Sequence, residues 1–367
     1  MNVLVSGGGT AGHVFPALAL ARRLVDDHGA RVRFIGTADG PEARLVPEAG
    51  FAFDAVDARP LRRGLSIETF MAPVAAVRSI SACRPSVERA DVVVGMGGYV
   101  SVPVGLAAAR TRRPLVLHEQ NAVPGLANRA LARRARTVAL TFAEAASRFP
   151  RRARTVVTGN PVRGSVLRVL DDRETLAKEG LVELDLEPGR PTLVVFGGSQ
   201  GALHVDLAAV EAIGLLDRPD LQVLLLTGRA HERRIAEAIP DGPVRVRVRG
   251  FLDRMELAYA VADLVVARAG ATTCAELSVC GIPAVLVPYP HATGGHQEAN
   301  AGAVERGGGA VVVMNDALSG ASFAAVVSEL LEAPERLATM RERMRSWSRP
   351  DAASALAAVV AEAGGPR

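Results

Sequence analysis

The chain has 367 residues, enough for two domains of roughly 150 to 200 residues, each with its own core. It is 49% hydrophobic but only 4% aromatic, which is typical of parallel sheets that helices bury on both faces. The net charge is +4, yet Lys178 is the only lysine and the arginines are scattered rather than gathered in a stripe with aromatics. This pattern disfavours a nucleic-acid partner and is compatible with smaller anionic ligands.

Three cysteines, Cys83, Cys274 and Cys280, show no CxxC spacing, so neither a disulfide framework nor a zinc site is predicted. A reducing, cytoplasmic compartment fits them. The N-terminus passes from an apolar strand straight into a glycine turn, without the basic segment of a signal peptide. Residues 92–109 form an uncharged run near membrane-spanning length, but a glycine turn and Pro103 interrupt it, which favours a strand, a turn and a helix.

Taken in chain order, the apolar runs predict two series of strands separated by periodic Ala/Leu/Arg helices. The first series is expected at residues 2–6, 32–36, 91–95, 115–118, 137–140 and 155–158. Turn-forming residues at 158–163 separate it from the second, and we place a hinge there. The second series is expected near residues 192–196, 222–226, 245–249, 263–267, 284–287 and 310–313. A helix is expected from about residue 348 to 363. This alternation predicts an α/β protein with parallel sheets and right-handed crossovers.

The two halves share one local pattern, a strand followed by a glycine turn and a helix, at residues 3–13 and 193–202. A third glycine turn follows a strand at residues 95–99. Any one of these could be a tight turn with close helix packing, but together they favour a phosphate-bearing ligand at the carboxyl ends of two sheets. The first turn also fits GxGxxG, but the nearest acidic candidate, Asp39, lies 27 residues past Gly12. Dinucleotide-binding folds usually have an acidic residue about 20 residues after the glycine turn, so an oxidoreductase is disfavoured.

A fourth turn, residues 268–276, precedes a helix and has two interpretations that the sequence leaves open. In the first, Thr273 and Glu276 form a capping box at the start of the helix. In the second, Glu276 is a carboxylate that accepts hydrogen bonds from the two hydroxyls of a ribose.

The histidines near strand ends are the main candidates for proton transfer. His13 ends the first glycine turn, where a neutral imidazole could act as a general base or simply pack at a helix end. His118 opens the run His-Glu-Gln-Asn at another strand end, and His291 and His296 follow a third. No acidic or cysteine partner stands at ligand spacing from these residues, so a metal site is not expected.

Taken together, the motifs resemble the MurG family, the UDP-GlcNAc:lipid I N-acetylglucosamine transferases of peptidoglycan synthesis. The resemblance covers most of the chain, and the motifs follow the family's order and spacing. They are the runs at residues 8–13, 97–101, 118–121, 159–163, 197–202 and 270–276, and the pair at 296–297. Two departures concern Ala11, where the family usually has glycine, and the uncharged loop at residues 292–295.

The resemblance implies a GT-B fold, an α/β architecture of two facing Rossmann-like domains with a deep interdomain cleft. Residues 1–160 would form the acceptor and membrane-side domain, and residues 161–345 the UDP-sugar-binding domain. Residues 346–367 would form a C-terminal helix that packs back on the first domain. The implied reaction is an inverting transfer of GlcNAc to the 4-hydroxyl of MurNAc in lipid I, giving the β-1,4 link of lipid II without a cofactor or metal.

The family's site residues carry over to matching positions. His13 is the expected general base, with Glu119 as the second candidate. Gly97, Gly98, Tyr99 and Ser101 would face the acceptor diphosphate. The expected donor-binding residues are Thr10, Ala11, Gly12, Asn121, Arg163, Ser199, Gln200, Gly201, Leu252, Ala271, Thr272, Thr273, Glu276 and Gln297.

Lipid I lies in the membrane, and residues 59–80 mix arginines with large apolar side chains. This segment could bind an anionic bilayer or could be an ordinary amphipathic helix. The resemblance therefore implies a cytoplasmic protein, peripheral on the inner face of the cell membrane, with roles in cell shape and division and with cell-wall synthesis or division proteins as further partners. The enzymatic alternative is a related UDP-sugar glycosyltransferase acting on another lipid or a natural-product aglycone. An inactive binding component would be expected to lack His13 or Glu276, and the chain has both.

Overall fold

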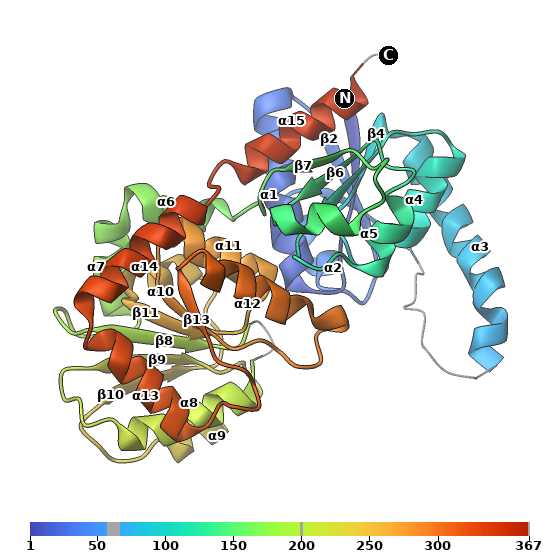
Figure 1. The fold of residues 1–367 in the computed structure, drawn as a ribbon. Coiled ribbons are helices and arrows are strands. Elements are labelled where there is room, and N and C mark those ends of the chain that lie inside the picture. Colours follow the sequence, from blue (N-terminus) through green and yellow to red (C-terminus); the bar gives the residue numbers. More distant parts are fainter. Residues whose placement is uncertain (57–66, 199–200, 366–367) are drawn as a thin grey trace. The chain divides into compact units, whose positions relative to one another are not determined.

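A computed structural model describes residues 1–56, 67–198 and 201–365, with the side chains of residues 67–77 excepted (Figure 1). The chain divides into two compact units, Met1–Arg163 with Pro350–Arg367, and Gly164–Arg349. Each unit is a parallel sheet with helices packed on it, which confirms the expected α/β class.

The sheet of the first unit has the strand order β3-β2-β1-β4-β5-β6-β7, and every described pair is parallel. Its strands are β1 (Asn2–Ser6), β2 (Arg31–Gly36), β3 (Ala52–Ala55), β4 (Val92–Gly95), β5 (Leu115–Glu119), β6 (Thr137–Leu140) and β7 (Thr155–Val157). All six expected strands are present. The sequence missed β3, a four-residue edge strand with no fully buried residue and hence no strong apolar run.

The core of the first unit follows the two-residue period of its strands. Val3 and Val5 of β1 pack on one face of the sheet, whereas Leu4 between them belongs to the cluster on the other face. The described helices of this unit are α1 (Ala11–His28), α2 (Glu42–Glu48), α3 (Ile67–Glu88), α4 (Ser101–Arg110), α5 (Leu126–Leu131), a 3-10 helix (Ala143–Arg148) and α15 (Ala352–Gly364). The last of these, red in Figure 1, packs against α1 and buries Leu356 and Val360 completely.

The sheet of the second unit has the order β10-β9-β8-β11-β12-β13 and is also parallel. Its strands are β8 (Thr192–Phe196), β9 (Gln222–Leu226), β10 (Arg245–Arg249), β11 (Leu264–Ala267), β12 (Ala284–Leu286) and β13 (Ala310–Val312). All six were predicted. Buried Val and Leu side chains along β8, β9 and β11 explain why the apolar runs were easy to detect.

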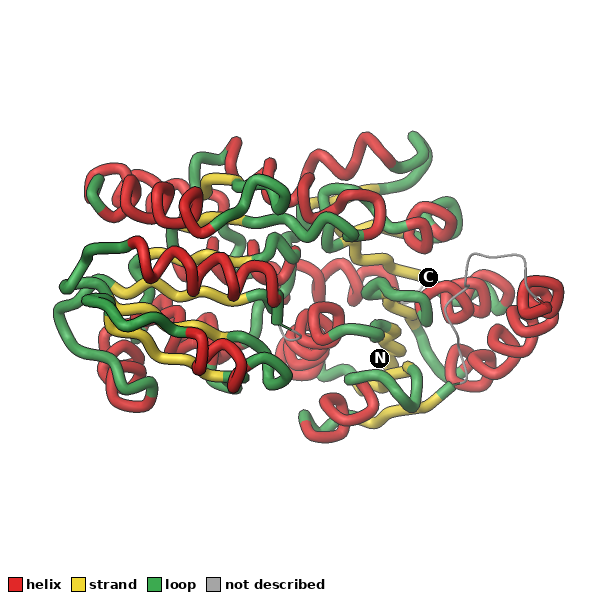
Figure 2. Tube along the Cα trace, turned by 90° about the horizontal axis from the view of Figure 1, so that it is seen from below, coloured by secondary structure: helices red, strands yellow, loops and turns green. Residues whose placement is uncertain are grey.

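Helices cover both faces of this second sheet (Figure 2). In the described part of the unit they are α6 (Gly164–Asp171), α7 (Arg173–Glu183), α8 (Leu203–Leu215), α9 (Glu232–Ala238), α10 (Met255–Val261), α11 (Ala271–Cys280), a 3-10 turn (Thr293–Gly295), α12 (His296–Arg306), α13 (Gly320–Leu331) and α14 (Pro334–Trp347). Helix α8 packs on α13, and α7 packs on α10.

Both sheets reverse their strand order at one point, between β1 and β4 in the first unit and between β8 and β11 in the second. The crevice at the carboxyl ends of such a strand pair is where open α/β sheets bind ligands. The glycine turns follow β1, β4 and β8, and the turn at residues 268–276 follows β11. The pattern of strand, glycine turn and helix that the sequence repeats at residues 3–13 and 193–202 therefore occupies equivalent positions in the two sheets.

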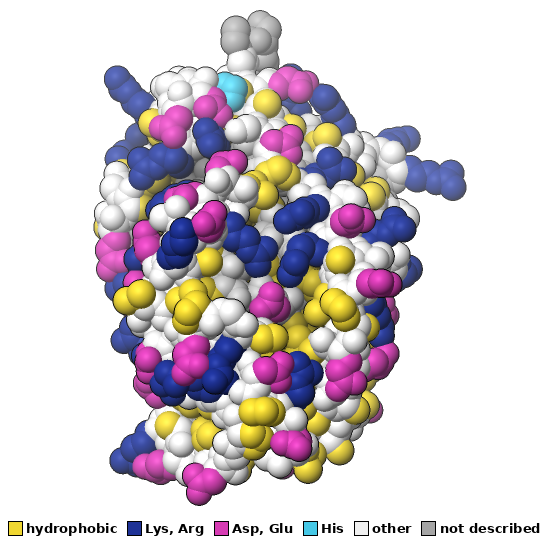
Figure 3. Space-filling view, turned by 90° about the vertical axis from the view of Figure 1, so that its left-hand side faces the viewer, with side chains coloured by type: hydrophobic (Ala, Val, Ile, Leu, Met, Phe, Trp, Pro, Cys, Tyr) yellow, Lys and Arg dark blue, Asp and Glu magenta, His cyan; other side chains and the backbone are white. Residues whose placement is uncertain are grey.

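The uncharged run at residues 92–109 forms β4, a glycine turn and α4, as expected. Among the described helices, none is long and apolar enough to cross a membrane. The three cysteines are buried and unpaired by disulfides. On the face drawn in Figure 3, basic side chains are interspersed with acidic ones and hydrophobic side chains are scattered.

Candidate active site

The first glycine turn places His13 at the carboxyl edge of the first sheet. Strand β1 ends at Ser6 and α1 begins at Ala11, with Thr10 in extended conformation before it. The Thr10 side chain does not cap the helix; its Oγ1 lies 2.9 Å from His13 Nδ1. When Nδ1 carries the ring proton, it donates a hydrogen bond to Thr10 Oγ1, and the lone pair that can accept a proton is on Nε2. Ala11, Gly12 and His13 are half-buried in the first turn of α1.

The turn after β4 packs directly on the turn after β1. A Cβ atom at Gly98 would lie 2.5 Å from the carbonyl oxygen of Gly8, and one at Gly97 would lie 2.9 Å from His13 Cδ2. Gly97 has a φ of 96° and Gly98 a φ of 80°, so the close approach and the backbone conformation each require glycine. The Ser101 hydroxyl, buried at the start of α4, donates to Gly97 O at 2.7 Å. The structure thus places the turn that carries the expected acceptor-side residues against the turn that carries His13, with Gly97 next to the imidazole.

A carboxylate that the sequence did not single out joins these turns. Glu42, at the start of α2, is 1% exposed and accepts hydrogen bonds from Gly9 N, Thr37 N and Thr37 Oγ1. Thr37 Oγ1 also lies 3.3 Å from the Tyr99 hydroxyl. A single glutamate in a short helix carries no motif, so the sequence alone offered no signal for it.

The motif at the end of β5 is held by its glutamate. Glu119 is 3% exposed and accepts four hydrogen bonds, two from Asn121 and one each from Gly125 N and Asn128 Nδ2. Burial raises the pKa of Glu119, and these donors oppose the shift. The carboxylate therefore fixes the loop that carries Asn121.

His118 is completely buried, and its Nε2 lies 3.0 Å from Gly159 O. Burial is the main cause that lowers the pKa of His118 to about 4; the Gly159 contact opposes the shift, and the nearby His13 makes a smaller contribution in the same direction as burial. His118 is therefore neutral near pH 7, donating from Nε2, and is not exposed to a substrate. Arg163, at the end of the first unit, lies over the Phe15 ring of α1, with its guanidinium carbon 4.5 Å from the centroid.

In the second unit the glycine turn after β8 contains Ser199 and Gln200, which lie outside the described residues. Their neighbours Gly198 and Gly201 have φ of 94° and 76°. A Cβ atom at Gly201 would collide with the carbonyl oxygen of Thr227, which follows β9. The turn therefore lies directly against the end of a neighbouring strand, where its backbone amides precede α8.

Helix α11 begins differently from the capping-box interpretation. It starts at Ala271 with Gly270 as its N-cap, and no side chain caps it. Thr273 thus lies inside the first turn with Thr272, and Glu276 lies in the second turn, so the capping-box interpretation is wrong. Glu276 is 4% exposed, and its Oε2 accepts a hydrogen bond from the Tyr259 hydroxyl at 2.8 Å.

Two further predicted donor residues lie on the loops that follow β10 and β12. Leu252 is half-buried after β10. Gln297, in the first turn of α12, accepts a hydrogen bond from Tyr289 N at 2.9 Å. Asn300 on the same helix donates to Ala269 O at 3.1 Å, which ties α12 to the turn that precedes α11. The structure thus connects Gln297 with the Gly270 turn within the second unit.

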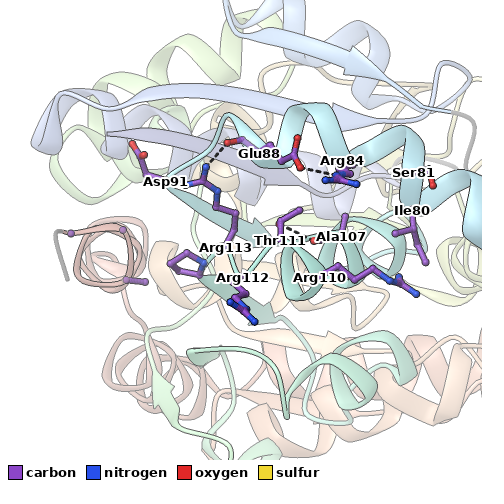
Figure 4. A pocket seen from close by; sticks show the side chains of 14 residues that line it. Ile80, Ser81, Arg84, Glu88, Asp91, Ala107, Arg110, Thr111, Arg112 and Arg113 are labelled. Carbon is purple, nitrogen blue, oxygen red and sulfur yellow. Dashed lines mark hydrogen bonds and ion pairs between the residues drawn. The ribbon is translucent and has the colours of Figure 1, made fainter.

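Across the described ranges, no group of three or more His, Cys, Asp or Glu side chains is arranged to hold a metal ion. A cavity of about 930 Å³ lies at the opposite, amino-terminal edge of the first sheet, beside the ends of α3, α4 and α15 (Figure 4). Its arginines are Arg84, Arg110, Arg112 and Arg113. Arg84 pairs with Glu88, and Arg113 donates to the Glu88 carbonyl at the end of α3. These two side chains stabilise a helix C-terminus, so we do not place the active site there.

Comparison with known proteins gives a consistent result over both units. Residues 3–140 match the glycosyltransferase family 28 N-terminal domain, and residues 192–356 match the glycosyltransferase family 28 C-terminal domain. A protein of Halothermothrix orenii is 40% identical over 97% of both chains, and one of Moorella thermoacetica is 42% identical over 98% of both. Both are named UDP-N-acetylglucosamine–N-acetylmuramyl-(pentapeptide) pyrophosphoryl-undecaprenol N-acetylglucosamine transferase. The crystal structure of Acinetobacter baumannii MurG is similar with a TM-score of 0.80 at 28% identity, over 98% of this chain and 99% of that chain.

Proposed function

Since this chain belongs to the MurG family of glycosyltransferases, we propose that it transfers GlcNAc from UDP-GlcNAc to the 4-hydroxyl of MurNAc in lipid I. Its GT-B fold and its class as a glycosyltransferase follow from that membership. The product would be lipid II, the precursor of peptidoglycan. The observation that carries the proposal is the arrangement at the carboxyl edge of the first sheet, where His13 and the turn at residues 97–101 are packed together.

The reaction forms a bond between the acceptor oxygen and C1 of GlcNAc while the bond from C1 to the donor diphosphate breaks. The configuration at C1 inverts, UDP leaves, and the acceptor hydroxyl loses its proton. His13 is suited to take that proton on Nε2 because Thr10 holds Nδ1. Glu119 is the weaker candidate, because its oxygens already accept four hydrogen bonds at 3% exposure.

The donor would be held by the carboxyl edge of the second sheet and by residues of the first. Backbone amides of the turn containing Ser199, Gln200 and Gly201 suit the diphosphate, since amides before a helix favour negative charge. Glu276 would accept hydrogen bonds from the ribose hydroxyls, beside Ala271, Thr272 and Thr273 of the same helix. The backbone of Leu252 would contact uracil, Gln297 and Asn121 would contact the sugar hydroxyls, and Arg163, Thr10, Ala11 and Gly12 would complete the set.

On the acceptor side, the glycine turn at residues 97–101 would bind the lipid-linked diphosphate. Because that substrate is anchored in a membrane, we expect the protein to associate with the inner face of the cell membrane. The basic, apolar segment at residues 59–80 is the candidate contact; its first part, to residue 66, lies outside the described residues. Contacts with other cell-wall synthesis or division proteins remain part of the same proposal.

The test is transfer of labelled GlcNAc from UDP-GlcNAc to lipid I in detergent or vesicles. His13→Ala should lower turnover by roughly a hundredfold to ten-thousandfold, the usual contribution of a general base, with UDP affinity unchanged. Glu119→Gln should lower turnover less than His13→Ala does, because the role of Glu119 is to hold the loop. Absence of a disaccharide product from the wild-type protein would reject lipid I as the acceptor, and normal turnover of His13→Ala would reject the base.

A further inference from the structure

The side chain of Glu42 is surrounded by three turns that meet at the carboxyl edge of the first sheet. One carboxylate oxygen, Oε2, accepts from Gly9 N at 3.0 Å, in the turn after β1. The other, Oε1, accepts from Thr37 N at 3.0 Å and from Thr37 Oγ1 at 2.9 Å, in the turn after β2. The Thr37 hydroxyl then reaches the Tyr99 hydroxyl, in the turn after β4. One buried carboxylate therefore links three strand ends.

The chain makes room for this carboxylate with glycines. A Cβ atom at Gly8 or at Gly40 would collide with the carboxylate group of Glu42, and one at Gly36 would lie 2.6 Å from its Cγ. The Tyr99 ring approaches from the other side, so that a Cβ atom at Gly9 would lie 3.2 Å from its Cε1. The carboxylate is therefore closely packed against the turns after β1 and β2, which leave no space for an extra carbon at these glycines.

The position of His13 depends on this contact. The Gly9 amide donates a hydrogen bond to Glu42, and Gly9 directly precedes Thr10 in the chain. The Thr10 hydroxyl is in turn the partner of His13 Nδ1. The turn at residues 97–101, which contains Tyr99, approaches His13 through Gly97. The same carboxylate thus fixes the turn that carries the imidazole and, through Thr37, the turn that lies against it.

We propose that Glu42 is a positioning residue for the transfer reaction, holding the His13 turn and the turn at residues 97–101 in the arrangement that the reaction needs. It acts through His13 and does not touch the substrate. This inference rests on the proposed function of His13. It requires a carboxylate rather than an amide, because both oxygens accept hydrogen bonds from N–H groups that cannot turn away.

Glu42→Gln is the direct test, because it keeps the size of the side chain but replaces one acceptor with an NH₂ group. That group would face either Gly9 N or Thr37 N, leaving a buried donor against a donor. Displacement of the His13 turn should then lower kcat by roughly a hundredfold. UDP affinity, measured by calorimetry on the full chain, should fall by a much smaller factor, because only Thr10, Ala11 and Gly12 of the proposed donor-binding residues lie in this turn and most of the others lie in the second unit. Glu48→Gln, on the exposed face of the same helix, is the matched control and should leave kcat unchanged.

A double-mutant cycle with His13→Ala separates positioning from a purely structural role. If Glu42 acts through His13, adding Glu42→Gln to His13→Ala should lower the residual single-turnover rate by less than about threefold. A wild-type kcat in Glu42→Gln, or the same loss with and without His13, would overturn the inference. Absence of GlcNAc transfer by the wild-type protein would instead reject the proposed function.

Thr37→Val keeps the test decisive should Glu42→Gln not fold. It removes only the hydroxyl that connects Glu42 with Tyr99 and leaves the bonds of Glu42 to Gly9 N and Thr37 N. We expect a several-fold decrease in kcat that disappears in the His13→Ala background. An unchanged kcat in folded Thr37→Val together with an unfolded Glu42→Gln would assign the carboxylate to stability alone.

Discussion

Three of the buried glutamates, Glu42, Glu119 and Glu276, lie near the carboxyl edges of the two sheets, and their hydrogen-bond partners bear on their roles. Glu42 and Glu119 accept bonds from backbone amides, so their oxygens are committed to holding turns. One partner of Glu276 is a side-chain donor, the Tyr259 hydroxyl. A hydroxyl can rotate toward another acceptor at small cost, which suits a carboxylate that is to accept hydrogen bonds from a ribose.

We therefore predict that Glu276→Ala weakens UDP binding by roughly tenfold to a hundredfold, the usual range for hydrogen bonds to a charged group. Tyr259→Phe keeps the carboxylate but removes the hydroxyl that orients it, and should cost only a few-fold. Isothermal titration of UDP with each variant measures both effects. If Glu276→Ala lowers the melting temperature and leaves UDP affinity intact, the carboxylate serves only to anchor α11.

At the level of residues, sequence analysis identified side chains that belong to contiguous motifs, such as Thr10 with His13. It could not identify Glu42, whose partners Gly9 and Thr37 come together only when β1 and β2 pair in the sheet. The capping-box interpretation at Thr273 failed for a related reason. The spacing of Thr and Glu was right, but the helix begins three residues earlier than a capping box at Thr273 requires, because its N-cap is Gly270 and its first residue is Ala271.

At the scale of elements, the packed pair of glycine turns is the feature that shapes the first sheet's carboxyl edge. The turn after β4 approaches the carbonyl of Gly8 so closely that only a hydrogen atom fits at Gly98. Gly50 has the same left-handed conformation, with φ of 84°, but no atom within 4 Å of an added Cβ. An alanine at Gly50 would therefore add only backbone strain, whereas an alanine at Gly98 would add the same strain and also push the two turns apart.

Gly98→Ala should therefore destabilise the protein by more than Gly50→Ala, whose strain alone costs roughly 1 kcal/mol. Gly98→Ala should also lower the rate of GlcNAc transfer by at least tenfold, because the turns at residues 7–13 and 97–101 must separate. Urea unfolding gives the first comparison and the labelled-transfer assay gives the second. Equal transfer rates in the two variants would show that the contact between the turns is not needed for the reaction.

Central strands such as β4, β8 and β9 were predicted well because they are buried runs of Val and Leu between turn residues. The edge strand β3 escaped because its residues are half-buried or exposed. Helix α15 was expected from its periodicity, and it begins at Ala352, where an aspartate precedes it. Its contacts with α1 could not follow from periodicity, because apolar residues such as Leu356 do not specify which surface they cover.

At the scale of the whole molecule, each unit contains a buried group whose shifted pKa affects stability between about pH 4 and pH 7, His118 in the first unit and Asp206 in the second, and these two shifts favour opposite responses to pH. In the first unit, burial lowers the pKa of His118 to about 4. In the second unit, burial raises the pKa of Asp206, on α8, to about 7, although the Ala202 backbone and the charge of Arg268 oppose the shift. Asp206 is fully buried, and among the described residues no group donates a hydrogen bond to its carboxylate.

The signs follow from which state of the protein binds the proton. Between about pH 6.5 and pH 4, unfolding lets His118 take up a proton that the folded first unit excludes, so acidification lowers stability there, by about 3 kcal/mol in total. Between about pH 4 and pH 7, the folded second unit keeps a proton on Asp206 that the unfolded chain releases, so raising the pH lowers its stability. These two contributions oppose each other within one pH range, so their sum depends less steeply on pH than either contribution alone.

Substitutions that remove one of these groups at a time should reveal the pH dependence that the other group gives to the free energy of unfolding. Relative to wild type, His118→Asn should gain free energy of unfolding as the pH falls from 6.5 toward 4, and Asp206→Asn should gain it as the pH rises from 4 toward 7. Urea unfolding of the full chain at intervals of half a pH unit measures these differences. Any constant loss from altered packing shifts a whole curve without changing its slope. Parallel curves for both variants and the wild type would mean that neither buried group changes its proton affinity on folding.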